Sequence, residues 1–164
     1  MGQRIKKANK WALWLAIIAL PIASLGVLRD LTTEDLVTGS EWIIAGRVDA
    51  IESRWNDARD YIYTYLTISV DEYWKNPQSP SEIIVQVPGG LVEDIEQKVS
   101  DTPEFQVGET VILFLFNQDG QKWVFGWEKG KYTVRDEMVL ELGISVSDFK
   151  NRVMNIQRQG GSND

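Results

Sequence analysis

The stretch from Tyr61 to Trp74 constrains the fold most strongly, because its side chains alternate in character. One set is aliphatic apart from a threonine: Ile62, Thr64, Leu66, Ile68 and Val70. The other set carries aromatic rings and hydroxyl groups: Tyr61, Tyr63, Tyr65, Thr67 and Ser69. Successive side chains of a β-strand point to opposite faces, so this period of two predicts a strand whose aliphatic face lies in a core.

Other segments of strand character flank this one. In chain order, the expected strands are residues 41–55, 61–74, 82–87, 110–116, 122–127, 132–134 and 138–140. The residues that bulge or end them are Gly46, Pro88, Gly89, Gly90, Gly108 and Gly120. An Asp-Gly turn predicts that the fourth and fifth strands form a hairpin. Residues 91–108 have no clear period, and we interpret them as a long connection with a helical turn over 92–98.

Two helices complete the expected elements. Thr32 and Asp35 have the spacing of a capping box, which predicts a short helix that ends near Gly39. Near the carboxyl end, Ser145 or Ser147 caps a helix whose apolar face carries residues 149, 153 and 156. The pattern favours a mainly β fold, a small antiparallel OB-like barrel of about five to seven strands with both helices. A β-sandwich is the alternative.

The first 28 residues have the layout of an export signal. Residues 1–10 carry four basic side chains and no acidic one, and Trp11–Leu28 is an uncharged run of 18 residues. This pattern predicts a signal peptide, cleaved after Gly26, or an anchor that holds the chain in the membrane through residues 11–28. The domain is then residues 31–159, followed by a disordered tail, 160–164. Either way, the domain lies outside the cytoplasm, in the cell envelope or secreted.

The exported part is strongly acidic. Residues 1–26 hold 4 of the 17 basic residues and none of the 24 acidic ones, so the remainder has a net charge of −11. Such a domain repels nucleic acid and anionic lipid head groups, whereas a basic protein surface suits it. We therefore expect a protein partner in the cell envelope and no nucleic acid.

The chain contains neither Cys nor His. It therefore lacks thiolate and imidazole nucleophile systems, disulfides and the usual zinc ligands. The sequence carries no catalytic motif and predicts no cofactor or metal site, so we expect a protein that is not an enzyme.

Aromatic side chains give the one candidate binding surface. Tyr61, Tyr63 and Tyr65 lie on one strand face, and Trp55 and Trp74 lie near its ends. An exposed row of rings could stack on sugars or on a partner's side chains. The alternative is that a helix or a second sheet covers the row, because aromatic residues are good strand formers.

A family resemblance accompanies this pattern. It is carried by Tyr63-Thr64-Tyr65, Lys75, Val87-Pro88-Gly89-Gly90, Pro103-x-Phe105-x-x-Gly108-Glu109 and Leu113-Phe114-Leu115. Over residues 31–127 the chain resembles a family of uncharacterised exported bacterial and archaeal domains. More distantly, it resembles the barrel of tissue inhibitors of metalloproteinases and netrin-like modules. The resemblance implies a barrel that displays loops to a partner. Those inhibitors chelate zinc through an amino-terminal Cys, which this chain lacks.

Together these features predict a non-catalytic, extracytoplasmic binding module that contacts a protein partner. Two alternatives stay open. One is a carbohydrate-binding domain that uses the aromatic strand face, and the other is an extracellular protease inhibitor, suggested by fold analogy.

Overall fold

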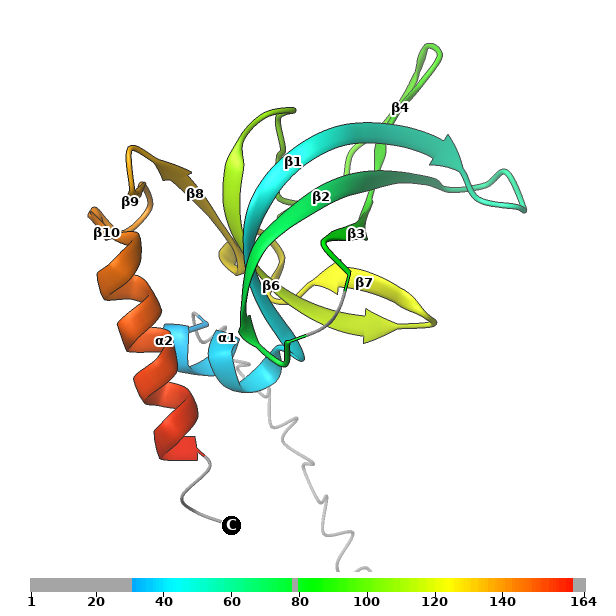
Figure 1. Cartoon of the computed structure of the whole chain (residues 1–164). Helices are drawn as coiled ribbons and strands as arrows, with labels where there is room; N and C mark the ends of the chain where they lie inside the picture. Colours follow the sequence, from blue (N-terminus) through cyan, green and yellow to red (C-terminus); the bar gives the residue numbers. More distant parts are fainter. Residues whose placement is uncertain (1–30, 78–79, 161–164) are drawn as a thin grey trace, which may run out of the picture.

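Two long antiparallel strands, β1 (Trp42–Trp55) and β2 (Ile62–Lys75), form the frame of the structure. The computed structural model describes residues 31–77 and 80–160, and both strands curve strongly across it (Figure 1). Their register shifts at three points, one of them at Gly46, where we predicted a bulge. A Cβ on Gly46 would lie 2.4 Å from the carbonyl oxygen of Ser69, so only glycine permits this close strand approach. Bulges bend and twist a strand pair, which helps the sheet to curl.

Five strands close into a ring, in the order β1–β2–β3–β7–β6 and back to β1. The other three are β3 (Glu82–Pro88), β6 (Thr110–Gln118) and β7 (Gln121–Val124). The predicted OB-like barrel is therefore confirmed, and the β-sandwich alternative is wrong. One pairing in the ring, β3 with β7, is parallel, so the sheet is mixed rather than wholly antiparallel.

The sheet continues beyond the ring and is longer than we expected. Strands β8 (Lys131–Arg135), β9 (Met138–Val139) and β10 (Ile144–Ser145) extend it from β6 and bring it to eight strands. The strands predicted over 132–134 and 138–140 correspond to β8 and β9, whereas β10, which has only two residues, was not predicted because it is too short to show a period.

The barrel interior is filled by the aliphatic residues that alternate along the strands. Leu66, Ile68, Val85, Leu113 and Leu115 are fully buried there. Leu66, Ile68 and Val70, from the even-numbered set of β2, therefore point into the core, as the period of two predicted.

Both helices pack on the outside of the barrel, on one side of it (Figure 1). Helix α1 (Thr33–Gly39) begins with the predicted capping box between Thr32 and Asp35. Helix α2 (Val146–Gly160) buries the predicted Phe149 and Val153, and the Ser145 hydroxyl accepts a hydrogen bond from the Asp148 N–H at 3.0 Å.

Two local expectations are wrong. Residues 90–97 form a hairpin of β4 (Gly90–Val92) and β5 (Ile95–Gln97) instead of a helical turn, and it projects from the barrel (Figure 1). Its turn places Glu93 at a positive φ of 54°, which ends any helix. The strand expected over 122–127 ends at Val124, and Trp127–Gly130 forms a 3-10 helix, η1.

The predicted signal peptide or anchor, residues 1–28 with the cleavage site near Gly26, lies outside the described residues. The described part of the chain contains no helix that is both long and apolar enough to cross a bilayer. Of the expected tail, Gly160 is the last residue of α2, and 161–164 lie outside the described residues.

Candidate functional site

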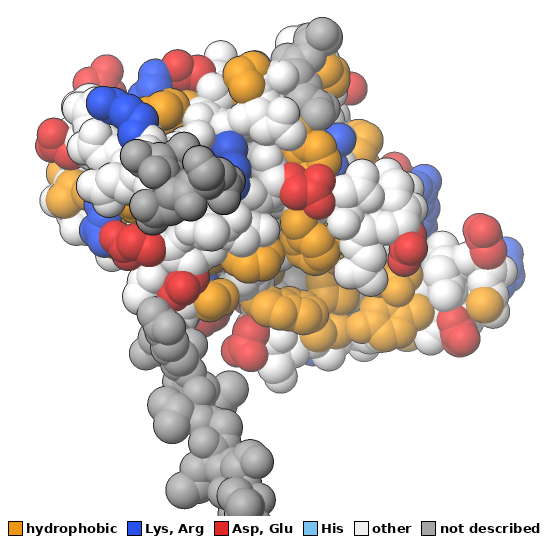
Figure 2. All heavy atoms as spheres, turned by 90° about the horizontal axis from the view of Figure 1, so that it is seen from below, with side chains coloured by type: hydrophobic (Ala, Val, Ile, Leu, Met, Phe, Trp, Pro, Cys, Tyr) orange, Lys and Arg blue, Asp and Glu red, His pale blue; other side chains and the backbone are white. Residues whose placement is uncertain are grey.

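An aromatic groove of about 570 Å³ lies on the outside of the barrel, where β3 and β7 separate. These two strands pair only at Val85 with Lys122 and at Gln86 with Trp123, and beyond that point their paths part. Six aromatic residues line the groove: Tyr61, Tyr63, Phe116, Trp123, Phe125 and Trp127. Hydrophobic side chains gather on this side of the molecule, with acidic side chains beside them (Figure 2). The volume is within the range of ligand-binding clefts.

Strand register explains why these rings share one face. Phe116 pairs with Trp123, which pairs with Gln86, which in turn pairs with Tyr65. Directly paired residues point to the same side of a sheet, so this row lies on the outer face, opposite the barrel core. Two residues earlier on β6, the same face is covered, because Phe114 packs against Phe149 of α2. The groove is the part of the outer face that the helices leave open.

Helix α1 borders the groove at its carboxyl end. Gly39 lies against the ring of Phe125, and a Cβ at Gly39 would be 2.2 Å from the ring's tip. Glycine at this position therefore leaves the space beside the helix that the Phe125 ring occupies.

Two of the five predicted site residues lie in the groove. The rings of Tyr61 and Tyr63 are 4.8 Å apart and tilted, and Tyr63 meets the ring of Trp123 edge-on at 5.7 Å. Both tyrosines are partly exposed, and no described helix or second sheet covers them. Burial, followed by electrostatic repulsion from its neighbours Tyr61, Tyr65 and Asp60, raises the pKa of Tyr63.

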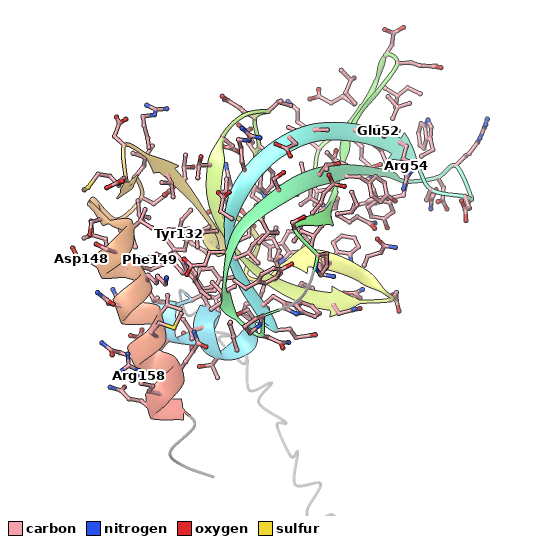
Figure 3. The ribbon with its side chains drawn as sticks, viewed as in Figure 1. Glu52, Arg54, Tyr132, Asp148, Phe149 and Arg158 are labelled. Atoms are coloured by element: carbon pink, nitrogen blue, oxygen red, sulfur yellow. The ribbon has the colours of Figure 1, made fainter. Side chains whose placement is uncertain are left out.

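The other three predicted residues lie elsewhere. Tyr65 is on the same strand face but outside the groove lining, and the Arg54 guanidinium stacks over its ring at 3.8 Å. Trp55 ends β1 opposite Ile62 and is partly exposed. Trp74 is buried under α2, with its ring 6.1 Å from that of Phe149. In Figure 3, Arg54 and Phe149 mark opposite ends of the fold, so this set does not form one surface.

The residues that complete the site come from β7 and the segment after it, including η1, to which we assigned no binding role. Trp123, Phe125 and Trp127 alternate in the sequence, as Tyr61 and Tyr63 do, and this period of two was the available signal. Trp127 is half-exposed, with a positive φ of 57°. Such backbone conformations are costly for a bulky residue and concentrate at functional sites.

Three polar groups lie at the groove. Gln86 is only 6% exposed, and its amide has no hydrogen-bond partner among the described residues. The buried indole nitrogen of Trp123 also lacks one there. Glu41 lies at the border, where its Oε1 accepts a hydrogen bond from the Asn117 N–H at 3.0 Å. Buried polar groups are nearly always hydrogen-bonded, so the Trp123 N–H has capacity for a ligand's acceptor, and the Gln86 amide beside it can add a donor and an acceptor.

The remaining acidic residues form no metal site in the part of the chain that the structure describes. Glu109, for example, accepts hydrogen bonds from Lys131 and from the Gln106 N–H, and so holds the loop that precedes β6. This ion pair has a structural role.

Comparison with known proteins adds no name to this arrangement: no family model matches the chain, and no curated protein matches its sequence. The class of protein is therefore inferred from the barrel and its groove.

Proposed function

We propose that this protein is a non-catalytic, extracytoplasmic binding module whose aromatic groove holds an extended segment of a protein partner in the cell envelope. The observation that carries the proposal is the indole N–H of Trp123, which is buried among the aromatic rings of the groove and has no hydrogen-bond partner in the described residues, with the Gln86 side chain beside it. A peptide backbone offers both an N–H donor and a carbonyl acceptor, and the Gln amide can satisfy both.

The character of the groove supports a peptide. Its lining is mostly aromatic, with Pro88 and Pro103 at the edges. Extended segments bind such aromatic troughs well, because their apolar side chains fill the spaces between rings while their backbone makes a few hydrogen bonds. OB-type barrels also bind ligands, namely oligonucleotides and oligosaccharides, on the face of their second and third strands, so a ligand site here suits the fold without indicating a peptide. This last point is an analogy of fold.

The extracytoplasmic location rests on the sequence. A basic head followed by 18 uncharged residues precedes the barrel, and the net charge of −11 beyond residue 26 suits a basic protein surface. The membrane through residues 11–28 is part of this proposal if the segment is retained.

A carbohydrate ligand is the second candidate, favoured by the tilted and partly exposed pair Tyr61 and Tyr63. Sugars stack on such rings, but each sugar also needs several hydrogen-bonding groups around it. The groove offers few, so the peptide ligand has the stronger support.

Site-specific photocrosslinking of the full chain in its host cells tests the proposal. Benzoylphenylalanine replaces Trp127 at the groove or, as a control, Leu140, which is similarly exposed but does not line the groove. We expect the Trp127 probe alone to capture a protein, with mass spectrometry locating the crosslink in one extended segment. Equal capture from both positions, or crosslinks to polysaccharide alone, would contradict the proposal.

A further inference from the structure

Glu41 is the one charged residue among the described residues that line the groove. Its backbone N–H bonds to the Leu115 carbonyl at 2.7 Å, and its Oε1 accepts the Asn117 N–H at 3.0 Å. Both ends of the residue are therefore tied to β6. Its second carboxylate oxygen has no hydrogen-bond or ion-pair partner within residues 31–77 and 80–160, and it remains available to a ligand.

Most of the charged residues next to the groove lining are acidic. Asp60, Asp119 and Glu128 each directly adjoin a residue of the lining. The ammonium group of the nearby Lys122 does not pair with Glu41; it lies over the ring of Trp42, 4.9 Å from the ring centre. A ligand cation at Glu41 would thus enter a region of negative potential within a domain that is acidic as a whole.

The two ends of the groove differ in chemical character, one carrying a carboxylate and the other two tyrosine rings. Glu41 is held beside β6, whereas Tyr61 and Tyr63 lie at β2, with β7 and β3 between. The ring of Trp123 on β7 lies between the two ends, 5.7 Å from the ring of Tyr63. The cation and the apolar side chain of an extended ligand therefore come from residues that are not neighbours in its sequence.

We propose that the groove selects a segment with a Lys or Arg side chain at Glu41 and, several residues away, an aromatic or large aliphatic side chain at the tyrosine pair. This inference rests on the proposed peptide-binding function and adds the chemistry of its ligand. Glu41 acts as a fixed carboxylate that pairs with the cation, and the rings take the apolar side chain. Gln86, between them, bonds the intervening backbone.

Fluorescence anisotropy with the purified full chain and labelled, end-blocked peptides tests this. The probes are Arg-Ser-Gly-Ser-Trp, the same peptide with Gln in place of Arg, and one with Arg next to Trp. Glu41 is exposed, and exposed ion pairs are weak, so we expect the first probe to bind about 2- to 5-fold more tightly than the Gln probe. The advantage should shrink as salt rises.

Three variants separate the outcomes. Glu41→Gln keeps an acceptor for the Asn117 N–H but loses the charge, so it should remove the Arg preference and make the Arg and Gln probes bind about equally. Glu82→Gln, a change at an exposed acid outside the groove, should behave as wild type. Tyr61→Ala should weaken every probe, with its folding checked by circular dichroism.

The results distinguish the two proposals. If Glu41→Gln keeps the full Arg preference, or if spacing has no effect, the inference about ligand chemistry is overturned while peptide binding stands. If no probe binds and photocrosslinking at Trp127 also captures no protein, the groove's peptide-binding function fails and this inference fails with it.

Discussion

The junction between α2 and the barrel depends on one ring, that of Phe149, and we expect Phe149→Ala to remove much of the protein's stability. Phe149 is 0% exposed, and its ring centre lies 4.8 Å from that of Tyr132, 6.1 Å from Trp74 and 6.4 Å from Phe114. Truncating a buried Phe to Ala typically costs about 3–5 kcal/mol. The loss of three ring contacts at once places the expected value near the upper end, about 4–5 kcal/mol.

Urea unfolding of the purified full chain, followed by far-ultraviolet circular dichroism, measures this change. Asn151→Ala is the matched control on the same helix, where an exposed side chain should alter the unfolding free energy by no more than about 0.5 kcal/mol. A loss below about 1.5 kcal/mol for Phe149→Ala, with an unchanged m-value, would refute the view that this ring joins the helix to the barrel.

Three further changes test other parts of the structure. Lys75 donates at 2.6 Å to two backbone carbonyls at the end of α1, so Lys75→Met should lower the unfolding free energy by about 1–3 kcal/mol in urea titrations, whereas Lys98→Met at an exposed site should not. A Cβ at Gly130 would lie 1.8 Å from a backbone carbonyl oxygen, so Gly130→Ala should lower the melting temperature sharply while Gly160→Ala leaves it unchanged. The hydrogen bond from Lys150 of α2 lowers the pKa of Glu72 in the folded state. The stability contributed by the Glu72 carboxylate should therefore be present above pH 4.5 and be lost as the pH falls through the folded pKa. Glu72→Gln should therefore reduce this acid-dependent loss, as measured by thermal unfolding between pH 2 and 7.

The barrel could be predicted because its strands follow one simple rule. Alternation along β2 identified Ile62, Leu66 and Ile68 as core residues, and all three are fully buried. The helix around residues 92–98 failed because that segment has no period. A turn that holds Glu93 at positive φ decided its structure, and such a conformation in a residue other than glycine leaves no clear sequence signal.

The candidate site was harder to predict, because it is assembled from four strands. Tyr61 and Tyr63 could be identified on one strand, but their partner Trp123 is brought to them by the β3–β7 pairing, which links distant parts of the chain. Trp74 shows a second limit. A register shift skips Asp71, so the two faces of β2 exchange, and a row extrapolated from the tyrosines no longer predicts which side chains are exposed.

The short pairing of β3 with β7 has a consequence for how the ring opens. Only the pairs Val85–Lys122 and Gln86–Trp123 join these strands, whereas β1 and β2 are paired along most of their length. Local opening begins where the fewest hydrogen bonds resist it, so backbone amides of β7 should exchange with deuterium sooner than those of β2. A ligand that contacts both Trp123 and Gln86 would link β7 to β3, so ligand binding should slow deuterium exchange of the β7 amides more than exchange elsewhere in the barrel.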